Sequence, residues 1–98
     1  MPELESVVGF LNDLLEVQGH PDYRTALNGL QVGGPERIGH VASAVDASVE
    51  TIDQAREIGA DLLVVHHGAF WGGLQPLVGR QHARVGTLIR NGIALYAA

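Results

Sequence analysis

The stretch "ADLLVVHHGAFWGG" runs from Ala60 to Gly73 and places two adjacent histidines directly after an apolar segment. The apolar segment, residues 61–65, reads DLLVV. A continuous apolar run of this length, followed by glycine, is typical of a strand that is buried on both faces of a sheet. We therefore expect residues 61–65 to form a central strand that delivers His66 and His67 to its carboxyl end.

Strand and helix patterns alternate around this segment. Ser48 is expected to cap one helix and Gly59 to follow its last turn. In the next helix, Val85, Leu88 and Ile89 are expected to face inward. The predicted order is strand 41–45, helix 48–59, strand 61–65, helix 82–92 and strand 93–97. This order predicts an α/β fold with a parallel β-α-β-α-β core and right-handed crossovers.

The N-terminal part of the chain adds an amphipathic helix to this core. Its apolar residues recur at helical spacing, at Leu4, Val7, Val8, Leu11, Leu14 and Leu15. Such a stripe packs on one face of a sheet. The turn-rich segment 28–39 follows, in which Leu30 to Val32 are expected to form a short strand. Residues 1–98 are therefore expected to form a single α/β domain.

The composition limits the classes of function. The chain has 98 residues, 46% of them hydrophobic, so a core is available. Without cysteine, any metal must be held by His, Asp, Glu, Asn or water. The net charge of −5 and the scattered arginines disfavour nucleic-acid binding. The acidic N-terminus does not resemble a signal peptide, and no apolar run reaches the ~18 residues of a membrane span. We therefore expect a cytoplasmic protein.

The adjacent histidines suggest a metal site with particular geometry. Neighbouring side chains of a regular strand point to opposite faces, so His66 and His67 can chelate one ion only where the strand turns. Alternatively, each binds one ion of a pair. Two ions about 3.5–4 Å apart are a recurrent device for hydrolysis. Gly68 would let the backbone turn sharply. The competing interpretation is that both imidazoles only pack, with hydrogen-bonding neighbours.

Other residues near the pair have two interpretations each. Asp46, which follows strand 41–45, is expected to orient a metal-bound histidine by a hydrogen bond or to lead into the next helix as a cap, rather than to be a metal ligand itself. Phe70 and Trp71 form either the wall of a pocket or part of the core. Three further histidines are expected at the surface, namely His20, His40 and His82.

Three segments in sequence order resemble one known family. They are "NGLQVGG" (28–34), "DASVETIDQAREIGADLLVVHHGAFWGG" (46–73) and "TLIRNGIALYAA" (87–98). Together they resemble the NIF-three-like family (NGG-one-interacting factor three), whose members are often described as GTP cyclohydrolase I type 2 homologues. The resemblance implies a pair of divalent ions, for which His66 and His67 match two of the ligands. Zn, Mn, Fe, Co and Mg are all compatible with these ligands, whereas imidazole disfavours Ca.

The resemblance also implies a function and an assembly. It implies a hexameric ring and a metal-dependent hydrolase with a nucleotide-like or pterin-like substrate, in a pocket that would include Asn28, Gly68 and Trp71. The alternative is a non-enzymatic metal-binding adaptor or regulatory oligomer. Members of the family continue beyond the last strand and supply an Asp, a His and a Glu to the metals. This chain is therefore expected to be an N-terminal fragment with an incomplete site, and the alternative is a shortened protein whose site is completed by other chains.

Overall fold

The computed structural model describes residues 1–15, 29–70 and 75–98 of the chain. The elements in this part are α1 (Leu4–Leu14), β1 (Gly29–Val32), β2 (Val41–Asp46), α2 (Val49–Glu57), β3 (Leu62–His67), α3 (Gly79–Arg90) and β4 (Ala94–Ala97). The predicted α/β fold, with its β-α-β-α-β core and additional N-terminal helix, is confirmed. The short strand expected at residues 30–32 is also present, as β1.

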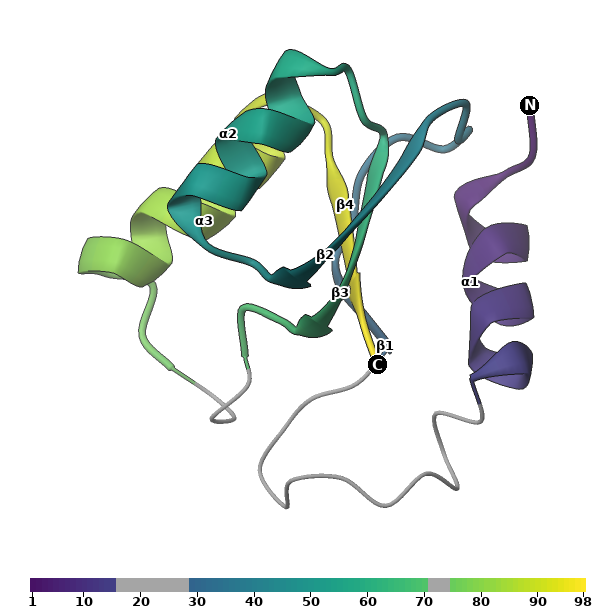
Figure 1. Cartoon of the computed structure of the whole chain (residues 1–98), viewed down its shortest axis with the longest axis horizontal. Coiled ribbons are helices and arrows are strands. Elements are labelled where there is room, and N and C mark those ends of the chain that lie inside the picture. The colour runs from purple at the N-terminus through teal and green to yellow at the C-terminus, as the bar shows by residue number, and fades with distance from the viewer. Residues whose placement is uncertain (16–28, 71–74) are drawn as a thin grey trace.

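The sheet has the strand order β1-β4-β3-β2 (Figure 1). Strands β2, β3 and β4 are parallel, whereas β1 pairs antiparallel with β4. The sheet is therefore mixed, with a parallel core and one antiparallel edge strand. In register, Asp46 of β2 lies opposite His67 of β3, and Val65 of β3 lies opposite Ala97 of β4. The carboxyl ends of the parallel strands meet at the lower edge of the sheet in Figure 1.

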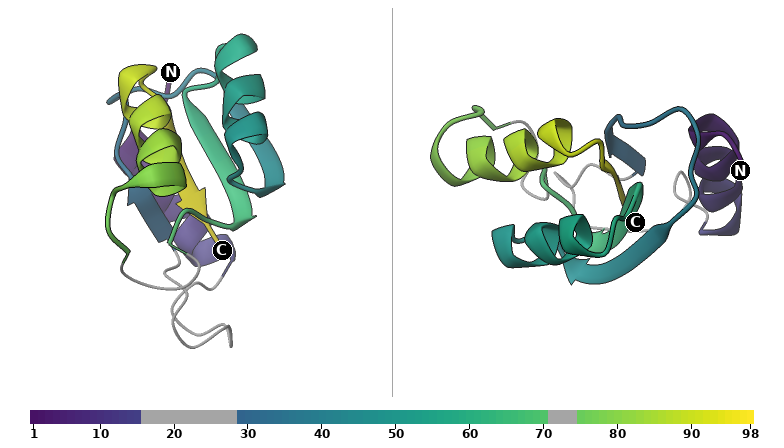
Figure 2. Two further views of the ribbon diagram at one scale, coloured as in Figure 1. Left: turned by 90° about the vertical axis from the view of Figure 1, so that its left-hand side faces the viewer. Right: turned by 90° about the horizontal axis from the view of Figure 1, so that it is seen from above.

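Helices cover both faces of the sheet. Helices α2 and α3 lie side by side on one face, and α1 lies on the other (Figure 2). Alternation along β3 sends Leu63 into the core beneath α2 and α3, and Leu62 into the core beneath α1. On the α1 side, the buried Tyr96 hydroxyl donates to Asn12 Oδ1 at 2.8 Å. Burial raises the pKa of Tyr96.

The helix ends follow the sequence signals closely. The Ser48 side chain caps α2 by accepting from the Thr51 N–H at 3.1 Å. Gly59 follows α2 with a φ of +74°, and Gly92 follows α3 with a φ of +62°. A side chain would strain both positions, which explains why glycine ends each helix.

One inward-facing residue of α3 was predicted incorrectly. The helix begins at Gly79 rather than at His82, and Val85 and Leu88 face the core as expected. Ile89, however, is 64% exposed. The stripe that meets the sheet passes through Gln81, Val85 and Leu88, so the residue after Leu88 lies on the solvent side. A polar residue, Gln81, takes an inward position that apolar periodicity did not indicate.

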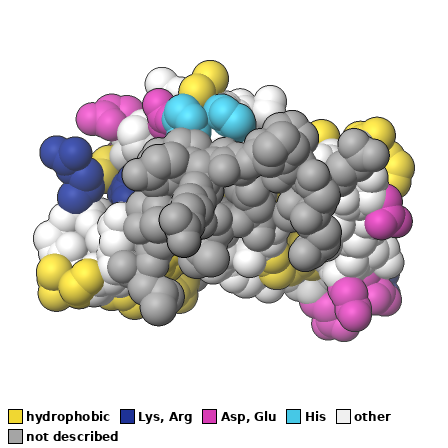
Figure 3. Space-filling view, turned by 90° about the horizontal axis from the view of Figure 1, so that it is seen from below, with side chains coloured by type: hydrophobic (Ala, Val, Ile, Leu, Met, Phe, Trp, Pro, Cys, Tyr) yellow, Lys and Arg dark blue, Asp and Glu magenta, His cyan; other side chains and the backbone are white. Residues whose placement is uncertain are grey.

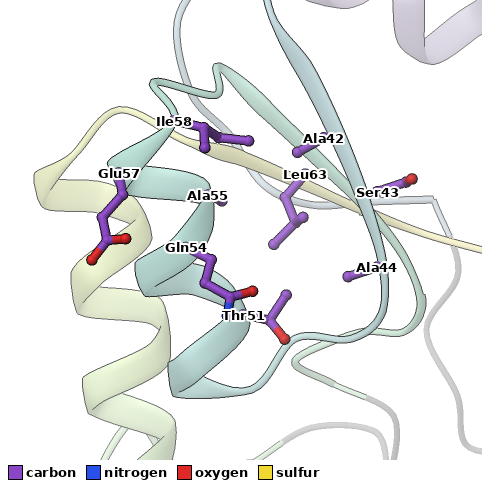
Figure 4. A pocket seen from close by; sticks show the side chains of 9 residues that line it. All are labelled: Ala42, Ser43, Ala44, Thr51, Gln54, Ala55, Glu57, Ile58 and Leu63. Atoms are coloured by element: carbon purple, nitrogen blue, oxygen red, sulfur yellow. The ribbon is translucent and has the colours of Figure 1, made fainter.

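Strand β2 is an edge strand with apolar side chains in solvent. Val41 and Val45 are 51% and 65% exposed. Between β2 and α2 lies a hollow of about 380 Å³, which Figure 4 shows from close by. Small side chains such as Ala42, Ala44 and Ala55 line it, and none of the lining residues is a histidine. This hollow is therefore separate from the histidine pair.

None of the helices in the described part of the chain is long and apolar enough to cross a membrane.

Candidate metal centre

The central strand carries both histidines to the carboxyl edge of the sheet. Strand β3 continues through His67, beyond the predicted end at residue 65. The ring centroids of His66 and His67 are 4.5 Å apart, with an angle of 36° between the ring planes. The register places Asp46 of β2 beside His67. The fold thus brings together the three residues that the sequence singled out at this edge.

The imidazole of His66 is held by β4. Its Nδ1 lies 2.8 Å from the main-chain oxygen of Ala98, directly after that strand. A main-chain oxygen can only accept, so Nδ1 is the protonated nitrogen and donates. In this tautomer the lone pair of the His66 ring lies on Nε2, the nitrogen that can bind a metal.

The imidazole of His67 is held by β2, on the other side of the central strand. Its Nδ1 lies 2.8 Å from Asp46 Oδ1. A carboxylate also only accepts, so in the neutral ring of His67 the lone pair again lies on Nε2. The His67 and Asp46 side chains are 40% and 62% exposed. Figure 3 shows histidine side chains together at the surface, beside an acidic side chain.

This arrangement matches the usual surroundings of a metal-binding histidine. Such a histidine almost always donates its other ring N–H to a carboxylate or a main-chain carbonyl, which fixes the tautomer and the ring orientation. Here His67 has the first kind of partner and His66 the second. Of the two interpretations of Asp46, the structure shows the contact with His67, since Ser48 caps α2.

The donor set is incomplete within the described ranges. Among residues 1–15, 29–70 and 75–98, no three His, Cys, Asp or Glu side chains lie close enough together to hold one ion. The imidazole pair fits two ligands of a metal centre, and no described carboxylate completes a set of three donors with them.

Close packing leaves no room for a side chain at Gly68, directly after the pair. A Cβ on the buried Gly68 would lie 2.8 Å from Ala97 Cβ and 2.7 Å from Gln31 Cδ. Phe70 is partly buried and packs against the core below α2 and α3, as its core interpretation predicted. Asn28 and Trp71, the other two pocket residues that the sequence suggested, lie outside the described residues.

Two of the other histidines, His40 and His82, are not part of this arrangement. His40 precedes β2 and His82 lies in α3, and both are exposed as predicted. His20 lies outside the described residues. His40 and His82 therefore offer matched controls for the pair.

Two polar residues of α3 support the loops beside the pair, and sequence analysis missed both. The buried Gln81 donates to the Ala69 carbonyl at 2.9 Å. Arg84 donates to the carbonyls of Ala69 and Ala47 at 3.2 and 3.4 Å, and to the Gln81 side-chain oxygen. Burial, and to a smaller extent the charge of Arg80, lower the pKa of Arg84. The sequence pattern that could have indicated Gln81 and Arg84 is the presence of polar residues on the inward stripe of an amphipathic helix.

The fold and the sheet-edge imidazoles define an α/β protein with a candidate metal centre. The sequence profile described as Duf34/NIF3 (NGG1p interacting factor 3) matches residues 2–98. The chain belongs to this family, which confirms the resemblance found in the sequence.

Similar proteins support the same family. A protein of Halobacterium salinarum called "GTP cyclohydrolase 1 type 2 homolog" is 47% identical, over 98% of this chain and 38% of its own length. The protein of the same name from Archaeoglobus fulgidus is 46% identical, over 97% of this chain and 38% of its own. The crystal structure of TTHA1606 from Thermus thermophilus has a TM-score of 0.91 and 41% identity, covering 99% of this chain and 40% of that one.

This chain therefore spans less than two fifths of the length of the curated relatives named above.

Proposed function

We propose that His66 and His67 are two ligands of a dinuclear divalent metal centre, and that the longer family protein uses this centre for hydrolysis. The observation that carries the proposal is that both Nδ1 atoms donate to partners that can only accept. Both rings are thereby fixed in the tautomer whose Nε2 can bind a metal.

The chain's own residues orient the ligands. The Ala98 oxygen holds the His66 ring from the β4 side, and Asp46 holds the His67 ring from the β2 side. The ring centroids lie 4.5 Å apart, so ions bound one to each ring would lie close together, as the paired ions of hydrolytic sites do at about 3.5–4 Å. When bound, such ions activate water and clamp the attacking and leaving oxygens.

The charges at the site predict that this chain alone binds the metal ions weakly. Two neutral imidazoles leave the charge of two divalent ions uncompensated, and Asp46 contributes a single carboxylate beside them. The remaining ligands, a ring-shaped oligomer and a nucleotide-like or pterin-like substrate follow from the family resemblance and are part of the proposal. The relatives' name, "GTP cyclohydrolase 1 type 2 homolog", supports a nucleotide-like substrate.

Titration with Co²⁺, followed by its visible absorbance, tests the proposal. His66→Ala and His67→Ala should each weaken binding by more than about 100-fold, because each removes a direct ligand and not merely an orienting group. His82→Ala, which changes an exposed histidine of α3, should leave binding unchanged. Equal Co²⁺ affinity in His66→Ala, His67→Ala and the unmodified chain would contradict the proposal.

A further inference from the structure

A second hollow lies at the N-terminal ends of α2 and α3. It has a volume of about 260 Å³, and its lining residues are Ser48, Val49, Glu50, Arg80 and Arg84. The two helices lie side by side on the same face of the sheet (Figure 2). The hollow shares no lining residue with the candidate metal centre, but the loops after β2 and β3 connect the two, because Ala47 lies between Asp46 and Ser48 and Arg84 donates to the carbonyls of Ala47 and Ala69.

The hollow contains two positive charges without a paired carboxylate. Within the described residues, Arg80 and Arg84 form no ion pair, whereas Arg56 pairs with Asp53. Burial, and to a smaller extent the neighbouring Arg80, hold the pKa of Arg84 below its ordinary value, so the charge of Arg80 destabilises the charged form of Arg84. An anion between them would remove this repulsion.

Arg84 is already held in place for such a role. Its guanidinium donates to Ala47, Ala69 and the Gln81 side chain, so little side-chain freedom remains to be lost when a ligand binds. The five N–H groups of the Arg84 guanidinium outnumber these three acceptors, so donors remain for a ligand. The Nε atom is shielded from water and has no acceptor in the described part of the chain.

The other wall of the hollow is the first turn of α2. The N–H groups of Val49 and Glu50 belong to the first turn, where no partner exists inside the helix, and such groups favour oxyanions. Glu50 also lines the hollow, and its carboxylate opposes an anion. Replacing the Glu50 carboxylate with a neutral side chain should therefore strengthen anion binding, which provides a variant for the test.

We propose that the hollow between Arg80, Arg84 and the start of α2 binds a phosphate-type oxyanion. The guanidinium of Arg80 can donate two parallel hydrogen bonds, which matches the oxygens of a phosphate better than a spherical anion, and Arg84 adds its charge and its remaining N–H groups. Beside the histidine pair, the hollow would hold the phosphate group of a phosphorylated substrate. That role rests on the proposed function, whereas anion binding itself does not.

Titration with inorganic phosphate, followed by the amide NMR signals of the ¹⁵N-labelled chain, tests the inference. The signals of Ser48, Val49 and Glu50 should shift and saturate. Arg80→Gln should weaken binding about tenfold, the equivalent of ~1.4 kcal/mol for one charge-assisted contact. Glu50→Gln should strengthen binding a fewfold, because it removes the opposing charge. Arg90→Gln, in the last turn of α3, is the matched control and should have no effect.

Three outcomes would overturn the inference. They are the absence of saturable shifts, an equal loss in Arg80→Gln and Arg90→Gln, and unchanged affinity in both Arg80→Gln and Glu50→Gln. Arg84→Lys provides a second variant that keeps the charge but loses the fork of donors, and it should also bind phosphate more weakly. Its fold can be verified from the unchanged amide signals of β3 and β4.

The phosphate test is independent of the metal proposal. It is carried out with chelator present, and His67→Ala should bind phosphate like the unmodified chain. A failed phosphate titration leaves the Co²⁺ result intact, and the reverse also holds. A parallel titration with a nucleoside monophosphate identifies the source of the anion. Tighter binding than inorganic phosphate assigns the hollow to a phosphorylated ligand, and equal binding assigns it to the free anion.

Discussion

The two ends of the parallel strands form an amino edge and a carboxyl edge of the sheet. Each of these brings an aspartate close to a histidine, but the contacts differ. At the amino edge, Asp61 Oδ2 accepts from the main-chain N–H groups of Gly39 and His40, at 2.9 and 3.1 Å. At the carboxyl edge, Asp46 accepts from the ring of His67. The first carboxylate fixes a loop and leaves the imidazole exposed, whereas the second orients an imidazole. The contacting atom, and not the residue type, therefore distinguishes a structural edge from a candidate site.

The glycines at the two edges should differ most in their tolerance of a side chain. Gly68→Ala should lower the free energy of unfolding by about 2–3 kcal/mol, because the new Cβ would overpack against Ala97 on a buried strand. Gly39→Ala meets the Met1 sulfur at 2.5 Å, but this is the end of a flexible exposed side chain. Its effect should stay below about 1 kcal/mol. Urea denaturation of the two variants measures both values, and equal losses would remove this distinction between the edges.

The two aspartates should separate metal binding from stability. Asp46→Asn should weaken Co²⁺ binding about tenfold, because the ring of His67 loses its charged acceptor. Asp61→Asn should leave Co²⁺ binding unchanged and lower the free energy of unfolding by about 1 kcal/mol, since two main-chain N–H groups lose a charged acceptor. Paired Co²⁺ titrations and urea denaturation curves check these values. Similar metal affinities in both variants would argue against an orienting role for Asp46.

The smallest effect is expected along β2, which joins the two edges. Val41 lies at its amino end and Val45 near its carboxyl end, and both are exposed. Val41→Thr and Val45→Thr should each change the free energy of unfolding by less than about 0.5 kcal/mol, because little apolar area leaves a core. Thermal unfolding of both variants measures the change. A larger loss for Val45→Thr alone would show that the carboxyl edge depends on this side chain.

Much of the fold was predictable because its signals are local. The cap at Ser48, the glycine after α2 and the apolar run of β3 each depend on a few neighbouring residues. The antiparallel pairing of β1 with β4 joins segments far apart in the chain, and no local pattern specifies it. No local pattern shows that β2 is an edge strand either, so the exposure of its apolar residues could not be predicted from the sequence.

The candidate site was predictable in part for the same reason. The adjacent histidines and Asp46 follow strands whose carboxyl ends must meet at one edge, so their proximity follows from the topology. The oxygen of Ala98 belongs to the main chain, which has no signature in the sequence. Arg84 acts across the loops after β2 and β3, and only the packing of α3 brings it there.

The tethering of both imidazoles to neighbouring strands has a thermodynamic consequence. His66 of the central strand is fastened to the end of β4, and His67 to the end of β2, so both rings keep their orientation only while three strands stay paired. An ion that recognised this arrangement would bind the folded sheet more tightly than the unfolded chain. At a free concentration 100 times its Kd, and with negligible binding to the unfolded chain, such an ion would stabilise the fold by about 2.7 kcal/mol. The metal would then stabilise the pairing of the three strands.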